Sequence, residues 1–132
     1  MGAWGVGIFE DDTSCDLIDE AMDDGALTLI EEAMEVDMDQ YIDFEDAHKI
    51  IVSAALIDTV VNATDHHYPT ENFDEWLKDQ PHDEIAAFKD DIALRLHSVL
   101  ADSELSELWQ DEEESFPQWK AIIARLIQSL EK

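Results

Sequence analysis

The sequence contains a single cysteine, Cys15, and only seven lysine and arginine residues against 34 acids among its 132 residues. One cysteine excludes an internal disulfide and is typical of a protein made for the reducing cytoplasm. The scarcity of basic residues argues against direct nucleic-acid binding, because no patch of Lys and Arg is present to displace the counterions of phosphates. For the same reason we expect no attraction to an anionic membrane surface.

Long hydrophobic runs are also missing. The amino-terminus has no basic segment followed by an apolar one, so we expect neither a signal peptide nor a membrane helix. Apart from the three glycines within residues 2–7, the proline, glycine and serine residues are scattered, and no linker or repeat is visible. Hydrophobic residues nevertheless make up 45% of the chain. We therefore expect one domain over residues 1–132 with a substantial core.

The formal net charge of −27 is the most unusual property of the composition. Self-repulsion of this size opposes compaction and is screened by salt, so stability is expected to rise with salt or divalent cations. Most of the acids are expected to form a solvated surface. The excess of acidic residues is also consistent with a basic protein partner, bound cations, or adaptation to high salt.

Helical periodicity dominates the hydrophobic pattern, and no stretch alternates like a strand for more than a few residues. We predict an all-α fold, a compact single-domain bundle of about five to seven helices. An ordered, extended amino-terminal segment at residues 3–9 is expected to pack on the bundle, with Trp4 buried. Residues 47–63 are apolar almost all round, which is typical of a helix in the middle of a domain. Residues 64–72 are expected to form a loop.

Local signals place the other helices. A capping box at 13–16, with Thr13 as the cap, predicts a first helix that stops near Gly25, and a second short helix follows. Further helices are expected around residues 73–77 and over 83–101. A short helix begins at SELSELWQD, capped by Asp102 or Ser103. A second capping box at 115–118, with a proline in the first turn, is expected to open the last helix.

Few residues form a pattern that carries chemistry. An EF-hand loop registered on Gly25 would place Met22 at a ligand position, which excludes it. Glu45 and His48 have the spacing of one half of a di-iron site, but acids are so frequent that such spacings arise by chance. His66 and His67 are expected to be polar surface groups beside a proline loop. Candidate metal ligands therefore reduce to His48 and Asp58.

Asp58 is the exception to a simple structural interpretation. It lies in the apolar central helix, and an unpaired buried carboxylate is very costly. One interpretation is an ion pair with Arg95 or Arg125, or a bond from a backbone N–H. The other is a carboxylate that lines a pocket or a metal site. Cys15, in a first helical turn surrounded by acids, is not expected to be reactive.

Three stretches resemble one known family. MGAWGVGIFEDDTSCDLI, IVSAALIDTVV and SELSELWQD followed by QWKAIIARL resemble the opening, the central helix and the ending of the bacterial domain-of-unknown-function family 4259. Asp11 and Leu17 depart from its pattern, which usually has asparagine and tryptophan there. The resemblance supplies no activity. It points to a candidate functional cluster, Glu10, Asp12, Asp16 and Asp58, and to structural motif residues, Trp4, Gly5, Gly7, Phe9, Ser103, Glu104 and Trp109.

Two functions remain open from the sequence. The first is a small acidic cytoplasmic, non-enzymatic domain that binds and neutralises a basic protein, as immunity proteins and antitoxins do. The second is a carboxylate-based metal-binding or hydrolytic domain centred on Asp58 and the amino-terminal acids. Glu10 or Asp16 would then meet Asp58 around a cation or an arginine. No cofactor is predicted beyond a divalent cation in the second case, and the oligomeric state is left undetermined.

Overall fold

The computed structural model describes residues 5–131, and this part of the chain contains eight helices. The all-α class is confirmed, with eight helices in place of the predicted five to seven. They are α1 (Asp12–Asp24), α2 (Ala26–Met34), α3 (Phe44–Asn62), α4 (Phe73–Lys78), α5 (His82–Ala86), α6 (Lys89–Ala101), α7 (Glu104–Gln110) and α8 (Phe116–Leu130). Within the described residues no helix is long and apolar enough to cross a membrane. Trp4 lies outside the described residues.

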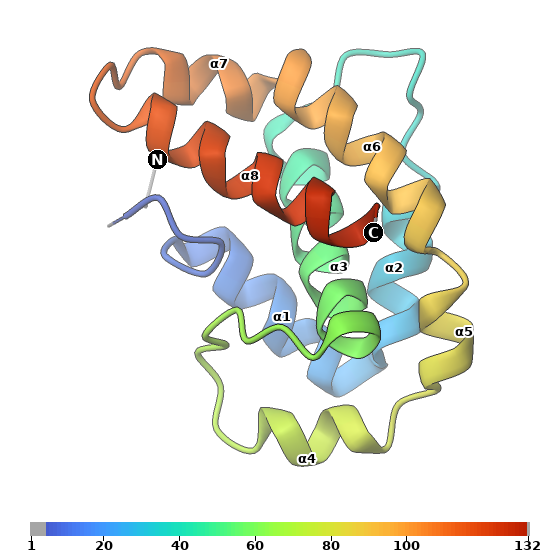
Figure 1. The fold of residues 1–132 in the computed structure, drawn as a ribbon. Coiled ribbons are helices and arrows are strands. Elements are labelled where there is room, and N and C mark those ends of the chain that lie inside the picture. Colours follow the sequence, from blue (N-terminus) through green and yellow to red (C-terminus); the bar gives the residue numbers. More distant parts are fainter. Residues whose placement is uncertain (1–4, 132) are drawn as a thin grey trace.

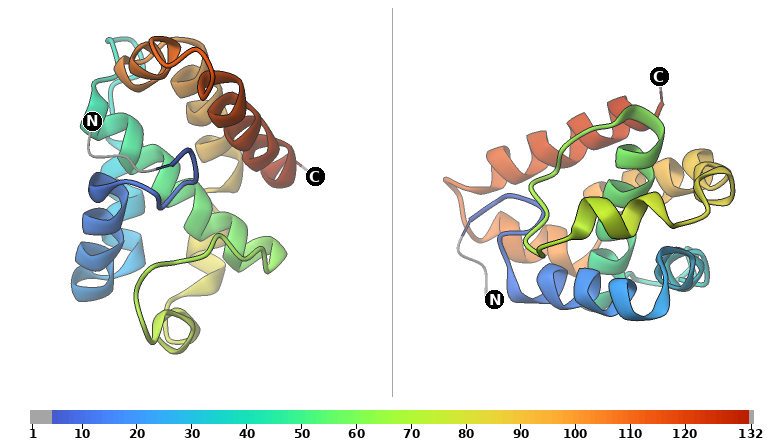
Figure 2. Two further views of the ribbon diagram at one scale, coloured as in Figure 1. Left: turned by 90° about the vertical axis from the view of Figure 1, so that its left-hand side faces the viewer. Right: turned by 90° about the horizontal axis from the view of Figure 1, so that it is seen from below.

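Helix α3 is the centre of the fold. It lies between α1 and α2 on one side and α6 and α8 on the other (Figures 1 and 2). Its residues from 50 to 58 are buried without interruption, as expected for a helix that is apolar on all faces. Helices α5 and α7 also contact α3, whereas α4 lies at the end of the molecule (Figure 1). The predicted central helix is thus confirmed.

The first helix begins earlier than the predicted capping box. Asp11, not Thr13, is the N-cap, and its Oδ1 accepts a hydrogen bond from the backbone N–H of Ser14 at 2.7 Å. An aspartate is as good a cap as a threonine, and its second oxygen here also accepts from the Ser14 hydroxyl at 3.0 Å. The predicted end is confirmed at Gly25, which has a φ of 106° that favours glycine.

The helix predicted over 83–101 is divided into α5 and α6. The amide of Phe88 bonds the carbonyl oxygen of Ile85 at 3.2 Å, three residues back, which tightens the chain into a turn. A new helix then begins at Lys89 with Asp90 and Asp91 in its first turn. Ile85 and Ile92 are both fully buried on either side of the turn, so the apolar period continues across it and does not reveal the break.

The last helix lacks the predicted capping box. Ser115 is the N-cap residue of α8 but has helical backbone angles and makes no side-chain capping bond. Proline in the first turn is confirmed, because Pro117 needs no N–H there. The large apolar residues from Trp119 onward recur at helical spacing, and all of them are buried except Ile122, which is half-buried. The buried residues of α8 are Trp119, Ile123, Leu126, Ile127 and Leu130.

The SEL segment, residues 103–105, lies at the start of α7 and is hydrogen-bonded to the start of α3. Ser103 is fully buried, and its hydroxyl accepts from the Ser106 amide at 3.1 Å and donates to the Val99 carbonyl at 2.7 Å. The backbone N–H of Glu104 bonds the carbonyl of Ile42 at 2.9 Å, and its carboxylate accepts from the Phe44 amide at 2.7 Å. Both residues therefore have a structural role, the capping of two helices, as predicted for Ser103.

Candidate functional site

Asp58 is fully buried near the end of α3 and is held by neutral donors and a histidine. Its Oδ1 accepts from Nδ2 of Asn62 at 2.7 Å and from the hydroxyl of Ser129 at 2.6 Å. Its Oδ2 lies 2.8 Å from Nε2 of His66. The predicted partners Arg95 and Arg125 are therefore wrong. Arg95 instead donates to the carbonyl oxygens of Ala33 and Val36 at the end of α2, at 3.2 and 2.7 Å.

The hydrogen bonds decide the charge of Asp58. Burial raises the pKa of its carboxyl, but the bonds from Ser129, Asn62, His66 and Thr64 outweigh burial and hold the pKa below its ordinary value. The carboxyl is therefore ionised at neutral pH. An ionised Oδ2 requires Nε2 of His66 to be the donor, which fixes that nitrogen as protonated.

A pocket of about 350 Å³ adjoins this network. Four segments form it: the amino-terminal turn, the end of α3, the loop after α3, and α8. Its apolar wall consists of Ile8, Ile122 and Leu126. Its polar lining consists of Asp58, Thr64, Asp65, His66, His67, Arg125 and Ser129. The volume lies at the lower end of the range found for small-molecule sites.

His66 and His67 differ sharply in their surroundings. The side chain of His66 is 13% exposed and bonds Asp58, whereas that of His67 is 89% exposed. The prediction of two polar surface histidines thus holds for His67 and is wrong for His66. Sequence reasoning missed His66 and Ser129 because one follows α3 in a loop and the other is 71 positions away from Asp58. Asn62, one helical turn after Asp58, was the available signal.

His48 belongs to a second buried network, at the start of α1. Its Nδ1 lies 3.0 Å from the hydroxyl of Ser14, which in turn lies 3.0 Å from Oδ2 of Asp11. Since the hydroxyl has one proton to give to Asp11, Nδ1 of His48 is the donor to Ser14. Its buried Nε2 has no hydrogen-bond partner within residues 5–131. Burial lowers the pKa of His48, although the Asp11 carboxylate partly opposes this. A cavity of about 20 Å³ lies beside it.

The three amino-terminal acids of the candidate cluster, Glu10, Asp12 and Asp16, are exposed, whereas Asp58 is buried. Glu10 folds back so that its Oε1 accepts from the amide of Gly7 at 2.9 Å. A Cβ on Gly5 or Gly7 would lie 2.5 Å from this carboxylate, but the carboxylate is the end of an exposed, flexible side chain, so the contact alone does not require glycine at either position. Asp12 and Asp16 are exposed on α1, with Asp12 in its first turn. Within residues 5–131 no group of three or more His, Cys, Asp or Glu side chains is arranged to hold a metal ion.

The remaining motif residues lie in the core. Phe9 is 5% exposed and its ring centroid lies 4.7 Å from that of Tyr68. Trp109 is buried and stacks on Trp119 at 6.4 Å. The thiol of Cys15 donates to the Phe9 carbonyl at 3.3 Å. Burial, followed by the charges of the neighbouring aspartates, raises its pKa, so the thiol is not activated.

One protein family matches most of the chain. The family described as "Domain of unknown function (DUF4259)" matches residues 2–122. No curated protein and no solved structure matches the chain. The matched range contains the glycine turn, Asp58 and the SEL segment, and it ends within α8. The chain therefore belongs to the DUF4259 family.

Proposed function

We propose that the chain is a small, acidic, non-enzymatic domain of the cytoplasm that binds and neutralises a basic protein, in the manner of an immunity protein or antitoxin. The observation that carries the proposal is the position of its acids. Asp11 and Asp58 are buried and Asp46 and Glu104 half-buried, and the remaining thirty of the 34 are exposed. Seven Lys and Arg residues cannot neutralise them.

The distribution of these acids favours one region. The first 48 residues contain no lysine or arginine. Helix α1 carries an acidic stripe, which we define as Asp12, Asp16, Asp19 and Asp23; all four are exposed and recur at helical spacing. A surface of one sign accelerates encounter with a surface of the other sign and discriminates against like-charged partners. A basic patch on a partner is the complement that such a stripe fits.

The test compares two variants of equal charge. One carries the Asp→Asn changes at all four stripe positions. The control carries Asp111→Asn, Glu112→Gln, Glu113→Gln and Glu114→Gln in the exposed segment between α7 and α8. The wild-type chain is used as bait in extracts of its source cell at low salt, and a captured basic protein is purified. We expect its association rate to fall with salt and to fall much further for the stripe variant than for the control.

Two results would contradict the proposal. Equal losses in both variants would indicate attraction to net charge alone. Recovery of no basic partner, or of one whose binding is insensitive to salt, would remove the reason for assigning a binding role to the acidic surface. The genes adjacent to this one provide independent evidence, because an adjacent toxin gene would support an immunity role.

We infer a second candidate, a hydrolytic domain, from the contact between Asp58 and His66 at the pocket. A buried carboxylate that accepts a hydrogen bond from one nitrogen of an imidazole orients the ring and leaves the other nitrogen as the acceptor that a general base needs. His66→Gln should then abolish hydrolysis of any ester or amide substrate found by screening, whereas His67→Gln, in the adjacent exposed residue, should not. Equal effects of the two changes would argue against this role. Binding of a divalent cation at Asp58 or His48 stays a prediction, to be checked by metal analysis of the purified protein.

A further inference from the structure

The lining of the Asp58 pocket includes one arginine, Arg125, which makes no bond to Asp58. Its two acids each lie beside a histidine: Asp58 bonds His66, and Asp65 lies 3.7 Å from Nδ1 of His67. Arg125 donates through Nε to the carbonyl oxygen of Ala121 at 3.4 Å, one turn back on α8. Among residues 5–131 no carboxylate lies within ion-pairing distance of its guanidinium.

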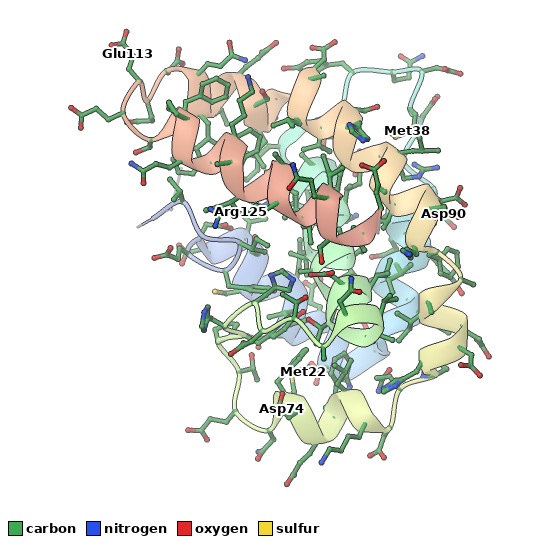
Figure 3. The ribbon with its side chains drawn as sticks, in the orientation of Figure 1. Met22, Met38, Asp74, Asp90, Glu113 and Arg125 are labelled. Carbon is green, nitrogen blue, oxygen red and sulfur yellow. The ribbon has the colours of Figure 1, made fainter. Side chains whose placement is uncertain are left out.

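This is unexpected in a chain with 34 acids and seven Lys and Arg residues. Arg125 extends from α8 toward the amino-terminal segment (Figure 3), where Gly7 and Ile8 form the opposite wall of the pocket. Arg125 is exposed, and within residues 5–131 its terminal NH₂ groups have no hydrogen-bond partner; they present a planar fork that matches the two oxygens of a carboxylate.

The rest of the lining restricts the ligand. Ile8, Ile122 and Leu126 supply an apolar wall that fits a hydrocarbon or aromatic body. The ionised Asp58, together with the net charge of −27, disfavours ligands with several negative charges, such as phosphate esters. We propose that the Asp58 pocket binds a small monocarboxylate with an apolar body, whose carboxylate pairs with Arg125 and whose body lies against Ile8 and Ile122.

The proposal is tested with three probes of similar shape: benzoate, the neutral benzamide and the cationic benzylammonium. Each is titrated into ¹⁵N-labelled protein at physiological salt, and amide shifts are followed. We expect benzoate to perturb Gly7, Ile8 and Ile122 and to bind at least about tenfold more tightly than benzamide, since a charge-assisted pair is lost in the amide. Benzylammonium is expected to leave these residues unperturbed.

Two variants and a control locate the interaction. Arg125→Gln should weaken benzoate binding at least about tenfold. Lys120→Gln makes the same change of charge on the same helix at an exposed residue whose ammonium lies over Phe116, and it should leave binding unchanged. Ile122→Trp should block binding by filling the pocket without changing any charge. Circular dichroism checks that each variant is folded.

The outcomes separate this site from the function proposed above. Equal affinity for benzoate and benzamide, equal effects of Arg125→Gln and Lys120→Gln, or no perturbation of the pocket by any probe would each overturn the carboxylate site. None of these results bears on the basic partner, which is tested through the acidic stripe of α1. Conversely, the failure of the stripe variants would leave the benzoate titration unaffected.

Discussion

Replacing Asp58 by alanine removes the acceptor of three hydrogen bonds, from Asn62, Ser129 and His66, with lengths of 2.7, 2.6 and 2.8 Å. A hydrogen bond to a charged group contributes roughly 1.5–3 kcal/mol to stability. The three donors are not equally dependent on it, because Asn62 is exposed and also donates to the carbonyl of Ser129 at 3.0 Å. We therefore expect a loss of about 3 kcal/mol, less than the full sum, because donors at the rim of the pocket recover bonds to water.

That loss is a large fraction of the roughly 5–15 kcal/mol by which a domain is stable. It is measured by urea denaturation at neutral pH and moderate salt. Asp65→Ala is the matched control, because Asp65 lines the same pocket, has a side chain that is 77% exposed, and changes the net charge equally. The control should differ from wild type by no more than about 0.5 kcal/mol.

The pH dependence gives a second test with a definite sign. The pKa of Asp58 is lowered in the folded protein from 3.8, so its carboxylate contributes stability that is present above that value and is lost as the pH falls below it. The stability difference between wild type and Asp58→Asn should therefore shrink below pH 3.8. If Asp58→Ala were as stable as Asp65→Ala, or if the difference from Asp58→Asn did not change with pH, the buried carboxylate network would not stabilise the fold.

Three further predictions follow from the same contacts and charges. The melting temperature should rise from low salt to about 1 M NaCl, where the Debye length is about 3 Å, and an unchanged value would contradict net self-repulsion. Burial lowers the pKa of His48 from 6.5, so wild type should lose stability relative to His48→Gln as the pH falls below 6.5. A gain of stability relative to His48→Gln would mean that the fold stabilises the charged form of His48. Ser103→Ala should lower the free energy of unfolding, measured in urea, by about 1–2 kcal/mol, because the cap and the bond to Val99 are lost. Ser115→Ala, at a cap position without a side-chain bond, should lower it by at most about 0.5 kcal/mol. Equal costs for the two serines would contradict the capping assignment.

The sequence was sufficient for the helical class and for the central helix, because the apolar period is strong and α3 is apolar on every face. It was insufficient where two local solutions have nearly the same energy. Asp11 and Thr13 are both good caps, and only the reach of Asp11 to Ser14, beside His48, favours the earlier start. The turn at Phe88 is hidden for a similar reason, since the buried period runs through it.

The sequence identified Asp58 as a residue of the candidate site but did not identify its hydrogen-bond partners. Asp58 is conspicuous because a carboxylate in an apolar helix needs an explanation, and its place at a pocket agrees with one of the two interpretations. The sequence favours an arginine partner, because a full positive charge is the simplest compensation for a buried carboxylate. In the structure Asn62, Ser129 and His66 donate to the buried carboxylate instead. Ser129 and His66 reach it because α8 and the loop after α3 pack against the end of α3, and local sequence patterns do not predict this packing.

The boundary of the family match divides the Asp58 pocket between two parts of the chain. Residues 2–122 provide the carboxylate, the histidine loop and the glycine turn, while Arg125, Leu126 and Ser129 follow the match on the last turns of α8. The last turns of α8 therefore have two roles, because Leu126, Ile127 and Leu130 are buried in the core and Ser129 bonds the buried carboxylate, whereas Arg125 is exposed at the pocket. A substitution at Arg125 can change the charge at the pocket without disturbing the core, and a substitution at Leu126 or Ser129 cannot.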